Sequence, residues 1–354
     1  MFDIKQVFSS STLYTQAFEE SLINILSYKT ANTFILACAN FIQHPEMLNY
    51  NSSQLKEAFN YIEKDFLECQ NNNQVPDGSP DDIQVMNKII EIGFNNLEPI
   101  QSKEIEYKNS YFLINYNQLR SFRPERMSTV KNIQLDTNFN ASGFHFDKPF
   151  LKKETFSAGE INGRHISLLY NKFPFVKYHA LLVIDKENHN KQYLTKEYLD
   201  YVFSLQNHFH NNLPELVIAY NSLGAGASVN HLHFQVFLET QALPISSNMY
   251  KHNGGEMDYP ASCLFFSDQN SCWSFIKKLH ANNTPYNLLF KNNKIYCLPR
   301  NMNHCDHSYL NLSTCGWSEM AGVFNLPNKD SFTAINSDKL TEVMQLLSSR
   351  SILQ

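Results

Sequence analysis

The run Tyr220-Asn221-Ser222-Leu223-Gly224-Ala225-Gly226-Ala227-Ser228-Val229-Asn230-His231-Leu232-His233-Phe234-Gln235 joins a loop of small residues to an alternating segment. His231, His233 and Gln235 recur at every second position, which is the period of a β-strand, so we expect their side chains on one face. Leu232 and Phe234 then face a core. The loop offers backbone N–H groups that can hold phosphate oxygens, and an imidazole can attack phosphorus. The run therefore predicts a site for phosphoester chemistry on a strand.

The overall composition limits the classes of partner. The chain has 354 residues and a formal net charge of −5, which leaves no basic surplus to neutralise a nucleic-acid backbone. No stretch reaches the roughly 20 apolar residues that a membrane span needs, and the start Met1-Phe2-Asp3-Ile4-Lys5 lacks the features of a secretion signal. We therefore expect neither nucleic acid nor a membrane as a partner.

Cysteine usage indicates the compartment. The seven cysteines are odd in number and scattered, and no C-x-x-C pair occurs. Such thiols are typical of a reducing environment, so we predict a cytoplasmic protein with free cysteines. Export without a signal peptide stays open as an alternative.

Residues 1 to about 100 show the periodicity of helices. Apolar side chains recur at three- and four-residue spacing in the segments 13–28, 32–43, 53–69 and 83–96. Turn-forming residues fill 71–80. The region contains no motif that carries chemistry. Two interpretations stay open: a helical scaffold, or a surface that binds a protein partner or selects the substrate.

From about residue 105 the pattern changes to that of strands. Short runs rich in β-branched and aromatic residues precede the histidine segment, and Thr195 is a candidate N-cap for a helix that continues to Phe209. The predicted strands are residues 111–114, 165–170, 178–184 and 216–220, followed by the histidine strand itself. This order predicts a mixed sheet-and-helix unit around the histidines.

A second, weaker copy of this pattern follows residue 255. Ser271 is a candidate cap for a helix to His280, and the segments 285–290 and 294–299 predict a hairpin across Lys291-Asn292-Asn293. No second His-x-His occurs there. A final helix is predicted over residues 338–348.

Several segments, in order over residues 120–325, resemble one family. The histidine run itself is similar to that of the GDP-L-galactose and GDP-D-glucose phosphorylases, which form part of the histidine-triad superfamily in its galactose-1-phosphate uridylyltransferase-like branch. The further segments are Phe144–Lys148, Pro174–Ile184, Tyr259–Pro260 with Leu264–Phe266, Asn282–Leu289 and Glu319–Gly322. The chain departs from the family pattern at three positions, where His145, Asp147 and Tyr178 stand in place of Asn, Thr and Gly.

The resemblance implies an α+β fold. We expect a histidine-triad-like antiparallel sheet with packed helices, built as two such halves, one catalytic and one degenerate, beside the helical N-terminal region. The expected boundaries are 1–100 for the helical region, 101–245 for the catalytic half and 246–354 for the degenerate half.

The motif residues have separate expected roles. By the resemblance, His233 is the nucleophile that forms a covalent nucleotidyl-imidazole, and a neutral imidazole suits such an attack at physiological pH. His231 is expected to orient His233. Gln235 cannot act as an acid near neutral pH, but it can donate to a phosphate oxygen. A poor leaving group would then go unprotonated, which favours transferases and phosphorylases over hydrolases.

Other residues are candidates for substrate binding. The loop candidates are Asn221, Ser222, Gly226, Ser228 and Asn230, whose N–H and polar groups can stabilise charge on phosphorus; a plain glycine turn is the alternative. Lys148 and Arg164 either neutralise a diphosphate or are ordinary surface cations. Glu319 either binds sugar or ribose hydroxyls or forms a structural ion pair.

The predicted function is nucleotidyl transfer. A GDP-hexose is cleaved with inorganic phosphate to GDP and hexose-1-phosphate, through a guanylyl-His233 intermediate. The alternatives are a hydrolase of nucleotide sugars or dinucleotides, a transferase to another acceptor, and a non-catalytic nucleotide-binding module that acts through its helical region. We expect no cofactor and no metal ion. The run His304-Cys305-Asp306-His307 is interpreted as a polar loop, because neighbours on an extended chain diverge.

Overall fold

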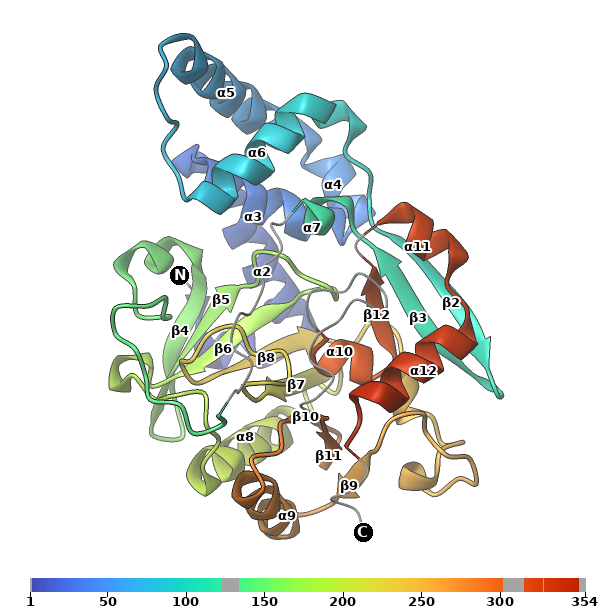
Figure 1. Ribbon diagram of the computed structural model, residues 1–354. Helices are drawn as coiled ribbons and strands as arrows, with labels where there is room; N and C mark the ends of the chain where they lie inside the picture. The colour runs from blue at the N-terminus through green and yellow to red at the C-terminus, as the bar shows by residue number, and fades with distance from the viewer. Residues whose placement is uncertain (1, 123–133, 302–314, 327, 350–354) are drawn as a thin grey trace.

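The computed structural model describes residues 2–122, 134–301, 315–326 and 328–349, and it is dominated by one nine-stranded sheet (Figure 1). All neighbouring strands in this sheet are antiparallel except β1 and β4, which are parallel. The order is β1 (Phe2–Asp3), β4 (Thr155–Ile161), β5 (Arg164–Tyr170), β6 (Ala180–Ile184), β8 (His233–Leu238), β7 (Leu216–Asn221), β10 (Tyr286–Lys291), β11 (Lys294–Pro299) and β9 (Leu264–Phe266).

The histidine strand β8 lies at the centre of the sheet. His233 is opposite Val183 of β6, and Gln235 lies between Leu181 of β6 and Ala219 of β7. Every residue of β8 is buried. The strand begins at His233, two residues later than predicted, because the chain at Leu232 bonds to the carbonyl of Asn190 instead of a neighbouring strand.

The N-terminal region is helical, as predicted. Thr30 and Thr33 form a capping box at the start of α3, and Ser79 caps α6, which has Pro80 in its first turn. In Figure 1 helices α5 and α6 project furthest from the sheet. The helices are α1 (Ile4–Val7), α2 (Ser11–Ile25), α3 (Ala31–Ile42), α4 (Pro45–Tyr50), α5 (Ser52–Asn71) and α6 (Pro80–Ile92).

One face of the main sheet packs against α1 and α2 and against α8 (Lys196–Phe209) and α9 (Gln269–Ala281), while α5 and α6 pack on α3. Phe234 and Val236 of β8 belong to this core, so the predicted alternation places these two side chains on the helix-covered face. Thr195 caps α8 as predicted, because its side chain accepts a hydrogen bond from the backbone N–H of Tyr198.

The opposite face packs against a small second sheet. Strand β3 (Ser110–Tyr116) lies between β12 (Val323–Leu326), which is parallel to it, and β2 (Gln101–Tyr107), which is antiparallel. This sheet is contacted by helices α10 (Trp317–Met320), α11 (Lys329–Ala334) and α12 (Ser337–Leu347). Helix α7 (Gln118–Ser121) follows β3 in the chain. Phe237 and Trp317 are part of the core between the two sheets. The motif therefore faces this second core.

Strand pairing crosses the predicted boundary between residues 245 and 246. Strand β7 pairs with β10, so both expected halves share one sheet, and β3 pairs with β12 from the other end of the chain. The domain boundaries themselves stay predictions. In the part of the chain that the structure describes, no helix is long and apolar enough to cross a membrane.

Candidate active site

Gln192 holds the backbone of His233. The N–H of His233 donates to Oε1 of Gln192 at 2.8 Å, and Nε2 of Gln192 donates back to the carbonyl of His233 at 3.1 Å. The same Nε2 donates to the carbonyl of Asn221 at 2.8 Å. One buried side chain thus ties the histidine strand to the start of the glycine loop.

The imidazole of His233 is held in one tautomer. Its Nδ1 lies 2.8 Å from the carbonyl oxygen of His231. Because a carbonyl can only accept, Nδ1 must carry the proton and Nε2 must keep its lone pair. Burial lowers the pKa of His233 to about 4, although the bond to His231 opposes the shift. The ring is therefore neutral at physiological pH, and its role as the nucleophile stays a prediction.

The carbonyl of His231 orients the ring of His233. The ring of His231 is in turn fixed by the backbone of Phe146. The backbone N–H of Phe146 donates to Nδ1 of His231 at 3.0 Å, so the proton of the neutral ring sits on Nε2. This Nε2 is buried and has no hydrogen-bond partner among the described residues. Burial, followed by the nearby His233, lowers the pKa of His231 to about 4. The ring of Phe146 also lies 4.8 Å from that of His233.

Gln235 is oriented by two distant residues. Nε1 of Trp317 donates to Oε1 of Gln235 at 2.7 Å, and Nε2 of His179 lies 3.0 Å from the same oxygen. Since an indole N–H can only donate, the amide oxygen must face Trp317. The amide NH2 makes no hydrogen bond to another described residue. It is therefore available to donate to a bound anion, as its predicted role requires.

The first residues of the loop are anchored by the second half of the sheet. Oδ1 of Asn221 accepts from Nδ2 of Asn287 at 2.7 Å and from the backbone of Trp317 at 3.0 Å. Oγ of Ser222 accepts from the backbone of Tyr286 at 2.9 Å. Both side chains are buried, so the structure uses them to shape the loop.

The glycine loop makes a close backbone approach at Gly226. Its φ is +98°, and a Cβ there would come within 2.7 Å of Cα of Gly316. Only glycine fits such a position. Two residues further on, Ser228 is exposed and makes no side-chain hydrogen bond to a described residue, so its hydroxyl is available to a ligand. Its role in binding stays a prediction.

Three of the remaining predicted binding residues are engaged within the protein. Nδ2 of Asn230 donates to the carbonyls of residues 137 and 138, and its Oδ1 accepts from the backbone of Gln192. Arg164 pairs with Asp185 and Glu197, while Oε2 of Glu319 caps α10 by accepting from the backbone of residue 316. Binding of substrate by these groups stays a prediction, and for Arg164 the two carboxylates already balance the charge.

Lys148 differs from these three because no ion pair to a described carboxylate engages it. Its ammonium lies near His145, whose pKa is lowered by burial first and by Lys148 second. His145 belongs to a cluster in which its ring is 5.1 Å from that of His189 and 6.0 Å from that of His231. Nε2 of His189 lies 3.1 Å from Oδ2 of Asp147. Lys148 and the two unusual residues His145 and Asp147 thus stand beside the motif.

Within the described ranges, no group of three or more His, Cys, Asp or Glu side chains can hold a metal ion. The run His304-Cys305-Asp306-His307 lies outside the described residues.

Sequence reasoning missed the residues that support the motif from a distance. Gln192 and Trp317 carry no signal of their own in the sequence, whereas His179 stands in a segment quoted for the family resemblance. Arg120 is another supporting residue that the sequence did not reveal. Its guanidinium lies 5.0 Å from the ring of Phe175, and that ring packs on Trp317 and His179. Burial lowers the pKa of Arg120, and the nearby carboxylate of Glu319 partly opposes this.

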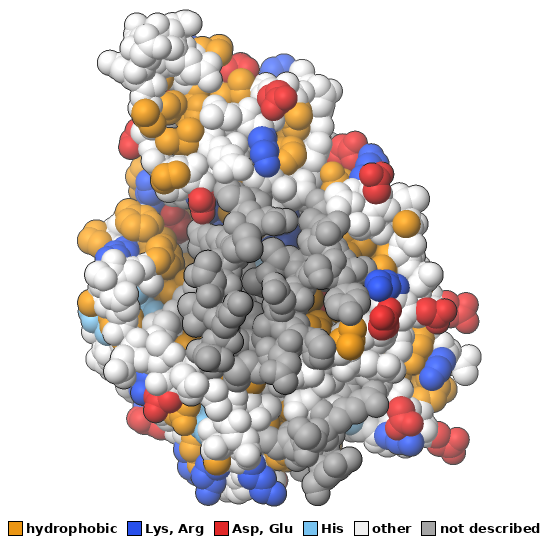
Figure 2. Space-filling view, in the orientation of Figure 1, with side chains coloured by type: hydrophobic (Ala, Val, Ile, Leu, Met, Phe, Trp, Pro, Cys, Tyr) orange, Lys and Arg blue, Asp and Glu red, His pale blue; other side chains and the backbone are white. Residues whose placement is uncertain are grey.

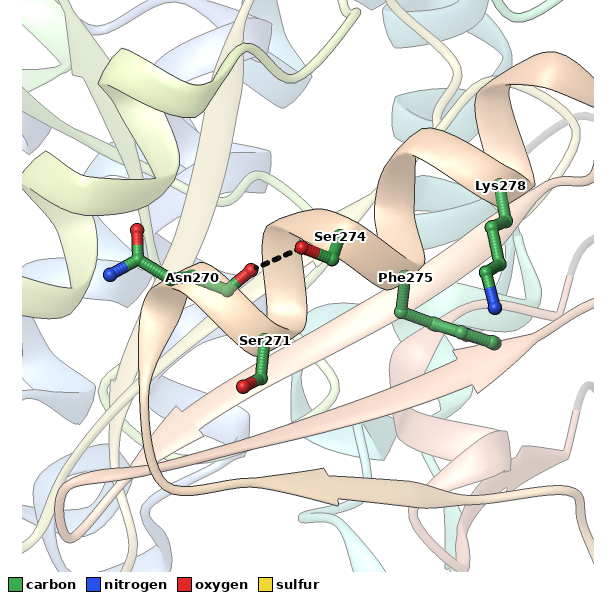
Figure 3. A pocket seen from close by; sticks show the side chains of 5 residues that line it. All are labelled: Asn270, Ser271, Ser274, Phe275 and Lys278. Atoms are coloured by element: carbon green, nitrogen blue, oxygen red, sulfur yellow. Dashed lines mark hydrogen bonds between the residues drawn. The ribbon is translucent and has the colours of Figure 1, made fainter.

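A separate surface pocket lies along α9 and shares no residue with this site (Figure 3). Its lining residues are Asn270, Ser271, Ser274, Phe275 and Lys278. Oγ of Ser274 donates to the carbonyl of Asn270, which belongs to the helix itself. Lys278 is therefore the single charged residue among the lining residues, and none of the other four carries an opposite charge.

The fold is of the α+β class, with a large antiparallel sheet and packed helices, as predicted. The structure is similar to the crystal structure of yeast Ap4A phosphorylase Apa2, with a TM-score of 0.50 and 15% identity over 75% of this chain and 93% of that one. The same yeast protein in complex with Ap4A and with AMP gives TM-scores of 0.50 at 14% identity, over 77% of this chain and 98% of that one.

The sequence comparisons give two matches, each over less than half of the chain. Residues 94–237 match the family described as GDPGP1-like, N-terminal domain. A protein from Danio rerio named GDP-D-glucose phosphorylase 1 is 28% identical over 153 residues, which cover 40% of this chain and 43% of that protein. The predicted resemblance to the GDP-hexose phosphorylase family is therefore confirmed, over less than half of the length of this relative.

Proposed function

We propose that the protein is a nucleotidyltransferase that cleaves a GDP-hexose with inorganic phosphate. The observation that carries this proposal is the 2.8 Å contact between Nδ1 of His233 and the carbonyl of His231, because it leaves the lone pair of Nε2 for attack. The named activity of the Danio rerio relative supports the choice of substrate.

The reaction proceeds in two displacements. In the first, Nε2 of His233 forms a bond to the α-phosphorus, and the bond from that phosphorus to the bridging oxygen breaks. The electron pair leaves with hexose-1-phosphate. In the second, an oxygen of inorganic phosphate attacks the same phosphorus, the N–P bond breaks and GDP is released. One difficult displacement thereby becomes two easier ones.

The surrounding groups stabilise the negative charge that develops on phosphorus. The amide NH2 of Gln235, with its orientation fixed by Trp317 and His179, donates to a non-bridging oxygen. Backbone N–H groups of the loop around Gly226 and the hydroxyl of Ser228 add further donors. Because the leaving group is already a phosphate, it departs without the acid that Gln235 cannot supply. Lys148 and the neighbouring His145 and Asp147 influence the choice of base or sugar.

The first experiment is product analysis by chromatography. Purified protein is incubated with GDP- and UDP-hexoses and with dinucleotides, with and without inorganic phosphate. We expect GDP and hexose-1-phosphate only when phosphate is present. If only the GDP-hexoses or only the UDP-hexoses react, the result identifies the base that the enzyme accepts. Release of GMP without phosphate would identify a hydrolase. Turnover of dinucleotides alone would replace the substrate class, and no product from any substrate would contradict the proposal.

A further inference from the structure

The connection from β5 to β6, residues 171–179, is held by the N-terminal helices. Nδ2 of Asn40 in α3 donates to the carbonyl of Asn171 at 2.9 Å. Nε2 of Gln43, just after α3, donates to the carbonyl of Pro174 at 2.9 Å. Both donors are buried. The start and the middle of this connection are thus fixed by a region that carries no chemical motif.

The end of the connection, Tyr178, is held more completely. Its hydroxyl donates to Oε1 of Glu19 at 2.8 Å, and its carbonyl accepts from the hydroxyl of Tyr14 at 3.2 Å. Its backbone N–H donates to Nε2 of His44 at 3.4 Å, and its ring lies 4.3 Å from that of His44 and 5.6 Å from that of Phe18. Every polar group of Tyr178 therefore bonds to residues 1–100.

These contacts hold a conformation that tyrosine disfavours. The φ of Tyr178 is +52°, which lies in the left-handed region. This conformation is energetically unfavourable for any residue with a Cβ. Such a conformation persists only where the surroundings over-determine it. The contacts to Glu19, Tyr14 and His44 supply that determination, and β6 starts two residues later, at Ala180.

The next residue, His179, reaches the catalytic motif. It is fully buried, and its Nε2 lies 3.0 Å from Oε1 of Gln235. Its ring packs on that of Phe175 at 4.4 Å, within the same connection. Consecutive residues thus face opposite ways: Tyr178 contacts the N-terminal helices, and His179 contacts the third position of the motif.

We propose that residues 1–100 act as a positioning element of the active site, in which the helices fix Tyr178 and thereby set His179 against Gln235. This inference rests on the proposed function for its catalytic consequence. If Tyr178 is released, the chain entering β6 rotates and the ring of His179 leaves Gln235. The amide then keeps only the bond to Trp317, and its NH2 no longer points steadily at the phosphoryl oxygen.

The test combines a spectroscopic and a kinetic measurement. The variants are Tyr178→Gly, which permits the same φ but loses the ring and hydroxyl, and Tyr178→Phe, which keeps the ring. Glu19→Ala removes one contact from the helix side and keeps the test valid if Tyr178→Gly does not fold. Tyr170→Phe is the matched control, since the Tyr170 hydroxyl donates to the carbonyl of Phe18 in α2 and not to Tyr178 or His179.

In protein labelled with ¹⁵N-histidine, we expect the ring signals of His179 to shift or broaden in Tyr178→Gly, less in Glu19→Ala, and not in Tyr170→Phe. For turnover we expect kcat to fall about ten-fold or more in Tyr178→Gly with KM within two-fold, because small misplacements of catalytic groups are costly. Tyr178→Phe should restore most of the activity.

Two results would overturn the inference. One is a Tyr178→Gly protein whose His179 signals and kcat match those of the unmodified protein. The other is a Tyr170→Phe protein that loses as much activity as Tyr178→Gly. The NMR measurement needs no turnover, so an inactive unmodified protein with the expected shifts would contradict the proposed function and leave the positioning contact established.

Discussion

Two antiparallel strand pairs lie side by side in the main sheet, and they differ in their connections. Strands β7 and β8 are joined by the loop of residues 222–232, whereas β10 and β11 are joined by Asn292 and Asn293 alone. Both asparagines are left-handed, with φ of 52° and 59°, as in a tight type I′ turn. The same pairing thus supports a long loop beside the histidines and a minimal turn in the second half.

The second pair lacks histidines of its own but supports the first. Nδ2 of Asn287 in β10 donates to Oδ1 of Asn221 and to the carbonyl of Ala225, both at 2.7 Å. The backbone of Tyr286 and the ring of Trp317 add bonds to Ser222 and Gln235. The comparison indicates a division of roles, in which one pair carries the motif histidines and the other holds the loop of the first pair in place.

The sharpest test of this division is His233→Ala. Loss of the nucleophile should reduce turnover on the order of 10⁴-fold or more, as for other nucleophile deletions, because no other described side chain has the same free Nε2 at the loop. Steady-state kinetics and mass spectrometry of the covalent nucleotidyl-protein measure the effect. His208→Ala, at an exposed position near the end of α8, is the control and should stay active. Normal turnover by His233→Ala would contradict the assignment.

The loop itself is tested by Gly226→Ala. The new Cβ would meet Cα of Gly316 at 2.7 Å, so the loop must move, and we expect turnover to fall about 100-fold. Gly163→Ala is the matched control: its φ of +77° is equally unsuited to alanine, yet nothing lies within 4 Å of its Cβ. The left-handed backbone should cost each variant about 1 kcal/mol of unfolding free energy, and Gly226→Ala should lose more because of the clash. Equal activity in the two would show that the close approach is unimportant.

The contribution of the second half is tested by Trp317→Phe. Phenylalanine preserves the ring that stacks on Phe237 at 4.7 Å but cannot donate to Gln235. We expect kcat to fall about ten-fold, and unfolding free energy to fall by about 1 kcal/mol, because Oε1 of Gln235 loses one hydrogen bond and keeps its contact with His179. Trp273→Phe, at the other tryptophan of the chain, should leave kcat unchanged. An unaltered kcat in Trp317→Phe would remove this link between the halves.

Acid pH should weaken the histidine site in two ways. Burial lowers the pKa values of His231 and His233 to about 4, so turnover should show no loss from His233 protonation between pH 6 and 8 and should halve near pH 4. The folded state also binds fewer protons than the unfolded state between pH 6.5 and 4. Unfolding free energy therefore decreases as the pH falls through this range, by about 3 kcal/mol for each such histidine.

Turnover and urea unfolding measured at the same pH values separate these two effects. Half-maximal turnover near pH 6.5 in protein that remains fully folded would indicate a solvated nucleophile, in conflict with the buried site.

The sequence predicted local features of this site better than its distant supports. Period-two alternation located β8, and turn chemistry located the β10–β11 hairpin, because both depend on neighbours in the chain. The bonds from Gln192 to His233 and from Trp317 to Gln235 span 41 and 82 positions, and no local pattern marks them. The predicted strand starts at His231 and Tyr178 were early by two residues, since the observed strands begin at His233 and Ala180.

The smallest expected effect belongs to the β10–β11 turn, through Asn293→Gly. The change creates Asn-Gly, the preferred pair for a type I′ turn, and the backbone bond from residue 293 to Oε1 of Gln206 is retained. Unfolding free energy should change by less than about 0.5 kcal/mol, with kcat and KM unaltered. Urea unfolding and steady-state kinetics measure both. A loss of activity as large as that expected for Gly226→Ala would make the tight turn a functional element. The contrast between the β7–β8 loop and the β10–β11 turn would then fail.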